Sequence, residues 1–255
     1  TLLVCDDTAF TGGMNIADNH VLGKHPGGVQ DLHFRCEGPI VDQLRRAFLL
    51  DWGFATGEFD QRDLPPSSNI MSGDSLCRMV LDGPGTEADP LNDLYCGVIS
   101  SAQHTVRIMT PYFLPSHELI AALRSAAQRG VSVRVVLPGK NNLPFVHWAT
   151  FRLLPVLLEA GVRVWFQPPP FAHTKLLAVD GYYCQIGSAD PTCIIHTILI
   201  KCHIVPHSSI CGCLSEYIDC LISFYRRDRR ICRARTCPHI DIAVRVGDNS
   251  GCTLC

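Results

Sequence analysis

The sequence predicts an α/β fold built from two halves, the second of which holds a largely parallel sheet flanked by helices. After residue 75, apolar strand patterns alternate with amphipathic helix patterns, and that alternation is typical of parallel βαβ units. A polar stretch rich in Pro and Ser, 58–75, reads as a linker. A pattern of strand, Asp, turn, strand and Gly occurs at 2–18 and again at 176–190, which indicates a duplicated half-domain.

Composition and charge exclude several classes of protein. The chain has 255 residues with 47% hydrophobic content, which is enough for a core and excludes a disordered tail. A formal net charge of -2 gives no overall attraction to nucleic acid or to anionic lipid, so binding of a polyanion would need a local patch. No charge-free run is long enough to cross a bilayer and no leader pattern is visible, so we expect a soluble or peripheral chain.

The first half is predicted to contain two short strands and a helix. An apolar run at 2–5 stops at Asp6, and a second apolar run follows at 9–12, which predicts two strands around a turn. Residues 39–52 place apolar side chains at roughly helical spacing after Pro39. We therefore expect a helix that turns one face to the core.

The second half is predicted to alternate strands and helices. Apolar runs with β-branched residues predict strands at 76–82, 106–110, 131–137 and 162–166. Helical spacing predicts helices at 91–103, 116–129 and 146–160. Ser116 is the expected N-cap of the middle helix, and Gly130 is its expected stop.

The segment HTKLLAVDGYYCQIGSAD, 173–190, carries the groups expected to do chemistry. His173 and Lys175 share a face if they lie on a strand, because alternate side chains do so. A lysine neutralises phosphate oxygens, and an imidazole attacks phosphorus or transfers a proton. The small Gly187–Ser188 turn would bring a hydroxyl and backbone N–H groups to the same phosphate.

This segment resembles the HKD motif of the phospholipase D superfamily. Further blocks are similar to bacterial cardiolipin synthases, namely TGGMNIAD, VQDLHFRCEGPIVDQL, VRIMTPYFLP, NNLPFVHWATF and the PPPF run before the motif. The resemblance covers residues 1–190. It implies a two-lobed α/β fold with one active site at the lobe interface, to which each lobe gives one HKD motif. One histidine would become a phosphohistidine, the other would act as general acid and base, and no metal or other cofactor would be required.

The resemblance also implies roles for individual residues. The implied catalytic residues are His173, Lys175 and Asp180. The implied phosphate-binding residues are Gly187, Ser188, Gly13 and Asn15.

Two carboxylates and four further residues complete the expected site. Asp31 would orient a site histidine, with a solvated loop carboxylate as the alternative, and Asp6 would be the counterpart of Asp180. Four further residues are candidates to shape a lipid or glycerol pocket, without a catalytic role. They follow a strand end or begin a helix near the crevice, and they are Tyr112, Phe113, His147 and Trp148.

The first HKD motif is incomplete. Aligning LLVCD with LLAVD puts Thr1 at the position of Lys175, whereas counting back from Gly12 puts Cys5 at the Asp position. On either alignment the first His would precede residue 1, so we expect an N-terminally truncated fragment. The expected domains are the rest of a first lobe at 1–62, a linker at 63–75, a second lobe at 76–190 and an atypical Cys-rich tail at 191–255.

The tail differs from the rest of the chain in its cysteines. Five of the fourteen cysteines are scattered before residue 190, as a reducing compartment allows, and the others follow it. One hypothesis is a change of reading frame near residue 190, which the other frames of the encoding DNA would test. The alternatives are a disordered or poorly packed tail, or a zinc or disulfide module whose spacings are not those of a standard finger, built from Cys211, Cys213, Cys232, Cys237 and His239.

The resemblance implies phosphatidyl transfer from one phospholipid to a glycerol hydroxyl of a second, which gives cardiolipin, with no turnover expected in a chain that lacks the first histidine. The implied partners are phospholipids such as phosphatidylglycerol and a membrane surface, at the bacterial inner membrane. One alternative is a hydrolase, either a phospholipase D or a nuclease, and another is a catalytically dead lipid-binding remnant. A nuclease predicts a basic groove with stacking aromatics, and the near-neutral charge does not favour nucleic acid as a partner.

Overall fold

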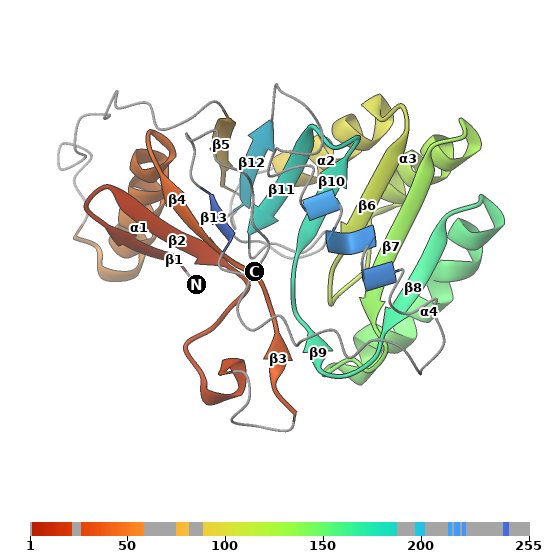
Figure 1. The fold of residues 1–255 in the computed structure, drawn as a ribbon, viewed down its shortest axis with the longest axis horizontal. Coiled ribbons are helices and arrows are strands. Elements are labelled where there is room, and N and C mark those ends of the chain that lie inside the picture. The colour runs from red at the N-terminus through yellow and green to blue at the C-terminus, as the bar shows by residue number, and fades with distance from the viewer. Residues whose placement is uncertain are drawn as a thin grey trace.

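The described residues form two large sheets with helices packed on them, and a short two-stranded sheet (Figure 1). The computed structural model describes residues 2–21, 27–58, 75–81, 89–187, 197–201, 214–215, 217–219, 221–222 and 242–244. The linker predicted at 63–75 lies almost entirely outside these residues, as do Ser188 and the five residues of the hypothetical metal or disulfide module. The predicted domain boundaries therefore stay predictions.

The smaller sheet has four strands in the order β1-β2-β4-β13. These strands are β1 (Leu2–Cys5), β2 (Thr8–Gly12), β4 (His33–Glu37) and β13 (Ile242–Val244), and a short 3-10 helix, η1 (Asp18–His20), follows β2. Helix α1 (Ile40–Thr56) begins after Pro39 and ends at Gly57, whose φ of 74° permits the left-handed turn. It buries Ile40, Val41 and Leu44 against the sheet, as expected of its apolar face, but Phe48 and Trp52, expected on the same face, are 42% and 52% exposed.

The larger sheet has seven strands in the order β5-β12-β11-β10-β6-β7-β8. The strands are β5 (Leu76–Val80), β6 (Thr105–Met109), β7 (Ser132–Pro138), β8 (Arg163–Gln167), β10 (Leu176–Val179), β11 (Tyr183–Gly187) and β12 (Thr197–Lys201). Only β6–β7 and β7–β8 pair in parallel, and the other four pairs are antiparallel. The predicted α/β class with a mixed sheet flanked by helices is confirmed, but a largely parallel sheet is not found, because β10 and β11 form a tight hairpin.

Three helices cover one face of this larger sheet (Figure 1). They are α2 (Pro90–Ser101), α3 (His117–Gln128) and α4 (Pro144–Glu159), each within two residues of its predicted start and end. The Asp89 and Ser116 side chains accept hydrogen bonds from backbone N–H groups in the first turns of α2 and α3. These caps satisfy donors that a helix start otherwise leaves unpaired.

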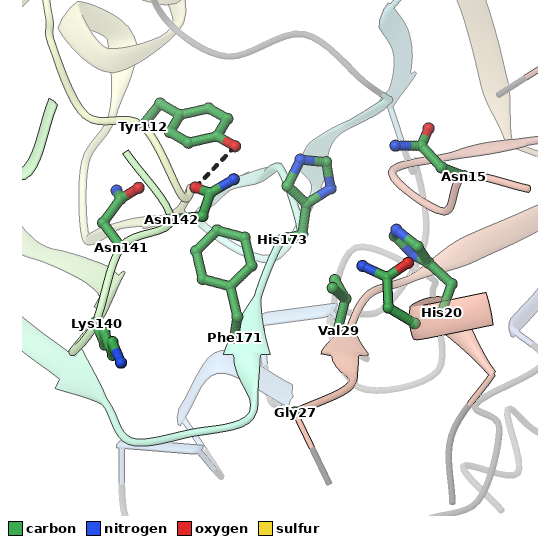
Figure 2. A pocket seen from close by; sticks show the side chains of 11 residues that line it. Asn15, His20, Gly27, Val29, Tyr112, Lys140, Asn141, Asn142, Phe171 and His173 are labelled. Carbon is green, nitrogen blue, oxygen red and sulfur yellow. Dashed lines mark hydrogen bonds between the residues drawn. The ribbon is translucent and has the colours of Figure 1, made fainter. Parts of the chain in front are cut away.

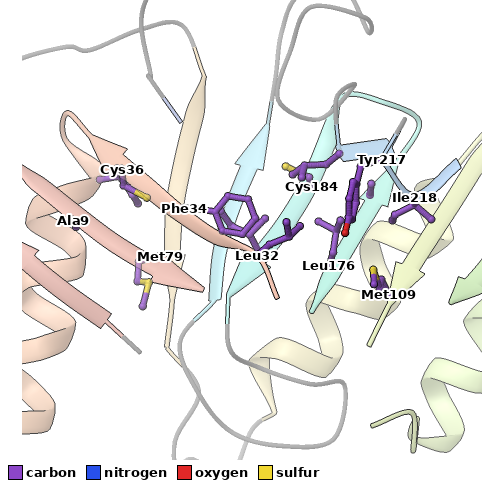
Figure 3. Close-up of a cluster of buried hydrophobic side chains, with 14 of the residues drawn as sticks. Ala9, Leu32, Phe34, Cys36, Met79, Met109, Leu176, Cys184, Tyr217 and Ile218 are labelled. Carbon is purple, nitrogen blue, oxygen red and sulfur yellow. The ribbon is translucent and has the colours of Figure 1, made fainter. Parts of the chain in front are cut away.

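The buried side chains form two clusters on opposite sides of the larger sheet. Leu177 and Val179 of β10 join the cluster under the helices. Leu176 and Ala178 face the other way and join the cluster shared with the smaller sheet, where Phe34 also lies (Figure 3). All four residues of β10 are therefore buried, and β10 is the middle strand of the larger sheet.

A short parallel ladder connects the two sheets. Strand β3 (Val29–Gln30) pairs with β9 (Phe171–Ala172). The backbone N–H of His173 continues the ladder by donating to the Gln30 carbonyl over 2.8 Å. The ladder fixes the segment that follows β9 against the segment that follows β3.

The two copies of the internal repeat adopt the same hairpin, with one difference. Leu2 pairs with Thr11 in β1–β2, and Leu176 pairs with Ile186 in β10–β11. The first turn holds two residues between the last paired positions and the second holds three. This register matches Leu2 with Leu176, so of the two alignments it favours the one that puts Thr1 at the position of Lys175.

The described part of the tail packs against the rest of the protein. Strand β12 inserts between β11 and β5, and β13 pairs in parallel with β4. Leu214, Ile218 and Ile222, at intervals of one helical turn, are buried in the cluster between the sheets. The described residues of the tail are therefore packed against the core.

Candidate active site

A pocket of about 420 Å³ opens between the two halves, next to the β3–β9 ladder. Figure 2 shows His173 pointing into it, with the side chains of η1 on one side and those of the loop after β7 on the other. The residues that line it are Asn15, Asn19, His20, Gly27, Val29, Tyr112, Lys140, Asn141, Asn142, Phe171 and His173.

His173 is held by a carboxylate from the other half of the chain. Its Nδ1 lies 2.9 Å from the Asp31 carboxylate and 3.2 Å from the Gly13 carbonyl oxygen. Both partners are acceptors, so Nδ1 carries the proton and Nε2 presents its lone pair. The sequence therefore brings together a histidine and a carboxylate that lie 142 positions apart.

The Asp31 carboxylate is fixed by its surroundings. Only 1% of its side chain is exposed, and its Oδ1 accepts the backbone N–H of Leu32 over 2.8 Å. A Cβ atom at Gly13 would overlap both carboxylate oxygens. Gly13 thus leaves the space that Asp31 occupies, and its predicted role in binding phosphate stays a prediction.

Lys175 lies on the other ring nitrogen of His173. Its Nζ is 3.0 Å from Nε2 and also donates to the His173 carbonyl oxygen. The side chain is buried, and its ammonium lies 5.6 Å from the centre of the Tyr112 ring. Residues 173–175 lie between β9 and β10 rather than within a strand, yet the two side chains meet as expected.

Asp180 is not brought to this pocket. It lies in the turn after β10, at the end of the strand opposite to His173, with a φ of 51°. Its carboxylate accepts backbone N–H groups from Gln103, His104 and Thr105, at distances from 2.5 to 2.9 Å. The structure therefore places Asp180 where its carboxylate holds the hairpin to the start of β6, and its predicted catalytic role stays a prediction.

The remaining predicted residues are spread between the pocket and the strands. Asn15 lines the pocket. Gly187 ends β11, one step beyond the Leu176–Ile186 pair and so opposite Lys175. Asp6 lies in the β1–β2 turn with a φ of 23°, and its carbonyl oxygen accepts from Arg45.

Of the four residues expected to shape the pocket, one lines it and three do not. Tyr112 lines the pocket, and its hydroxyl donates to Asn142 over 3.1 Å. Phe113 is fully buried in the cluster under the helices. His147 and Trp148 lie on α4, outside the pocket lining.

Sequence reasoning missed His20, whose ring centre lies 6.3 Å from that of His173. Burial lowers its pKa and outweighs the opposing charge of Asp31. Its buried Nδ1 has no hydrogen-bond partner among the described residues. No spacing rule marks this histidine, because η1 and the loop before it place it there.

The part of the chain that the structure describes holds neither a metal-site cluster nor a membrane-spanning helix. There, no group of three or more His, Cys, Asp or Glu could hold a metal ion. No helix among the same residues is both long and apolar enough to span a bilayer.

Comparison with known proteins agrees with the fold and the motif. Residues 95–193 match the family described as cardiolipin synthase, phospholipase D-like domain. A cardiolipin synthase from Alkalihalophilus pseudofirmus is 33% identical over 215 residues, which cover 82% of this chain and 42% of the relative. A probable cardiolipin synthase from Bacillus subtilis is 34% identical over 193 residues, 74% of this chain and 38% of the relative.

The chain thus spans about two fifths of the length of these curated relatives. Among solved structures, the phosphatidylserine synthase of Haemophilus influenzae superimposes with a TM-score of 0.57 at 15% identity, covering 87% of this chain and 60% of that one. That likeness concerns the fold. The sequence matches show that the chain carries a phospholipase D-like domain and is a homologue of bacterial cardiolipin synthases.

Proposed function

We propose that this chain forms part of a phosphatidyltransferase that makes cardiolipin from two phospholipids at a membrane surface. The observation that carries the proposal is the contact of His173, which lines the pocket, with the buried side chains of Asp31 and Lys175. An imidazole fixed by a carboxylate on one nitrogen has its other nitrogen free for proton transfer or attack. An ammonium beside it binds the phosphate that has to react.

In the proposed reaction His173 acts as the general acid and base. Once the phosphate is bound, Nε2 of His173 takes up a proton from solvent. A partner imidazole then forms an N–P bond as the P–O bond to the first lipid's headgroup glycerol breaks, and His173 gives that proton to the departing glycerol oxygen. A glycerol hydroxyl of the second lipid then gives its proton to His173 as its oxygen bonds to phosphorus and the N–P bond breaks. Asp31 supports this role, because a carboxylate on Nδ1 stabilises the imidazolium form in each cycle.

Lys175 changes partner in this scheme. Without substrate its ammonium donates to Nε2 of His173. A bound phosphate offers oxygens with more negative charge, so the ammonium moves to phosphate and releases Nε2 for the proton transfer. The polar asparagines of the lining are placed to bind the glycerol hydroxyls of the substrates.

The partner imidazole is proposed to come from an H-x-K segment upstream of Leu2. The register of the two hairpins supports this proposal, because a histidine three residues before Leu2 would precede β1 as His173 precedes β10. His20 is the competing candidate, since it already lies in the pocket.

The test is transfer from labelled phosphatidylglycerol in vesicles, with cardiolipin, phosphatidic acid and free glycerol measured separately. We compare this chain with an extended chain in which Thr1→Lys and a histidine two residues before it complete an H-x-K segment, each with and without His173→Ala and His20→Gln. Cardiolipin from the extended chain alone, lost with His173→Ala and kept with His20→Gln, supports the proposal. If the unextended chain makes cardiolipin and His20→Gln abolishes that activity, the partner role belongs to His20.

Two outcomes contradict transfer. Release of phosphatidic acid and glycerol without cardiolipin identifies a hydrolase that uses water as the acceptor. Binding of phosphatidylglycerol without turnover in either chain, unchanged by His173→Ala, identifies a lipid-binding remnant.

A further inference from the structure

Helix α4 exposes aromatic side chains on the face opposite to its core contacts. Phe145 and Trp148 are 67% and 69% exposed, and Phe151 is 47% exposed. Phe151 stacks on the half-exposed Phe166 of β8, with ring centres 5.4 Å apart. We call these four residues the α4 aromatic face. The other side of the helix is buried through Val146, Thr150, Leu154 and Leu157.

Such a helix is apolar on both sides. A surface helix normally turns a polar face to water, and clustered exposed aromatics mark a surface that meets a partner. The α4 aromatic face therefore needs an occupant, and the charges around it indicate which one.

Basic side chains flank the first three turns of this face. From Gly139 to Leu158 the sequence contains Lys140 and Arg152 but no Asp or Glu, and the one acidic residue of α4 is Glu159 at its last position. Lys140 and Arg152 are both exposed, and Arg152 lies one turn along the helix from Trp148. Tryptophan and phenylalanine with flanking Lys or Arg are the side chains that settle in the headgroup region of an anionic bilayer.

The position of the face relative to the pocket points to the same occupant. Lys140, Asn141 and Asn142 line the pocket, and α4 begins two residues later at Pro144. Phe145 is therefore about one helical turn of chain from the pocket lining. A surface that holds α4 would meet the pocket rim as well.

We propose that the α4 aromatic face docks the protein on the headgroup region of an anionic bilayer, with the pocket rim turned to the lipid. That a lipid then enters the pocket rests on the proposed function, whereas the docking itself does not.

Helix α1 offers a matched control within the same chain. It also exposes a tryptophan and a phenylalanine, Trp52 and Phe54, which are 52% and 89% exposed. Asp51 lies next to Trp52, and Glu58 follows the helix. The aromatic content is thus comparable, but the local charge is acidic and the residues are not part of the pocket lining.

The experiment places a single tryptophan on each helix of the full chain. Trp52→Phe with Trp165→Phe leaves Trp148, and Trp148→Phe with Trp165→Phe leaves Trp52. Vesicles contain equal parts of phosphatidylglycerol and phosphatidylcholine, with brominated chains as the quencher. We expect a blue shift and strong quenching of Trp148, and neither for Trp52.

Vesicle co-sedimentation adds an affinity to the test. Phe145→Ser with Trp148→Ser should weaken binding about tenfold or more, because two interfacial aromatics are lost. Trp52→Ser with Phe54→Ser should leave the affinity within about twofold, since these side chains lie off the docking surface. Equal quenching of the two tryptophans, or unchanged affinity of the α4 variant, would overturn the proposal. So would a blue shift of Trp148 that grows with protein concentration in the absence of vesicles, because that identifies a second copy of the chain as the occupant.

A last arm separates docking from catalysis. Turnover of monomeric short-chain phosphatidylglycerol requires the pocket but no bilayer, so the Phe145→Ser with Trp148→Ser variant should keep it in the extended chain. If Trp148 docks and no lipid is turned over by any variant, the proposed function fails and the docking surface stands.

Discussion

The two hairpins of the internal repeat share one template but differ in their surroundings. Strand β1 lies at the edge of the smaller sheet, where its residues alternate between half-buried and exposed. Strand β10 lies inside the larger sheet, and every one of its residues is buried. The same sequence pattern therefore gives an ordinary edge hairpin in one half and the rigid support of His173 and Lys175 in the other.

The turn aspartates show the same contrast. Asp6 and Asp180 both have positive φ values, 23° and 51°, which aspartate tolerates better than most residues. The Asp180 carboxylate receives three backbone N–H groups, whereas Asp6 offers its carbonyl oxygen to the exposed end of Arg45. Both copies of the repeat share the backbone conformation of the turn. The contacts of the turn aspartate differ, because different groups lie next to it in the two halves.

The largest expected effect concerns the histidine that precedes the buried hairpin β10–β11. His173→Ala in the upstream-extended chain should lower phosphatidyl transfer by about 10²- to 10⁴-fold, which is the usual contribution of a general acid or base. His147→Ala is the control, since His147 contacts Phe151 on α4 and lies outside the pocket lining. Initial rates of cardiolipin formation measure both, and comparable losses for the two variants would refute the assignment.

The contribution of the first half comes next in size. Asp31→Asn should lower kcat by about 10- to 100-fold with a smaller change in KM, as loss of an orienting partner does. The amide keeps the shape but not the charge that supports the imidazolium, so the acidic limb of the pH profile of kcat should move to lower pH. Asp18→Asn is the matched control, because the Asp18 side chain is exposed. An unmoved pH profile would show that Asp31 only packs.

Stability distinguishes the two turn aspartates. Asp180→Ala should lower the free energy of unfolding by about 2 kcal/mol, because three backbone donors lose their acceptor. Asp6→Ala should change it by less than about 0.5 kcal/mol, as surface substitutions do. Urea unfolding followed by circular dichroism compares them. Equal losses would mean that both turns are strained by removing aspartate and that the carboxylate contacts add nothing.

The smallest effect concerns pH and the first half. Burial lowers the pKa of His33 below its ordinary 6.5, so the folded form binds a proton less readily than the unfolded one. As pH falls below 6.5 the unfolded chain gains protons first, and stability decreases in that window. His33→Gln should flatten this part of the curve. Unfolding midpoints at several pH values between neutral and mildly acidic test it, and parallel curves for the two proteins would contradict the inference.

Local pattern predicted the elements well where the signal lies within one segment. Ser116 and Gly130 bracket α3 to within two residues, because a capping hydroxyl and a left-handed stop act over one turn. The histidine and lysine of the motif also meet as their spacing indicates.

The rest depends on contacts between distant segments. Asp180 reaches backbone groups more than 70 positions away, and no local feature tells those partners from a phosphate. The mixed sheet has the same origin, since β12 enters it from the tail after residue 190, where the pattern gave no clear strand. His20 is placed by a loop whose course only the folded chain determines.

The β3–β9 ladder makes the geometry around His173 depend on the docking of the two sheets. It holds only two residue pairs, yet it is what sets Asp31 against His173. A chain whose sheets have each formed but have not docked would carry an imidazole without its carboxylate. The support of His173 is therefore a property of the two sheets together, and neither half of the molecule has it alone.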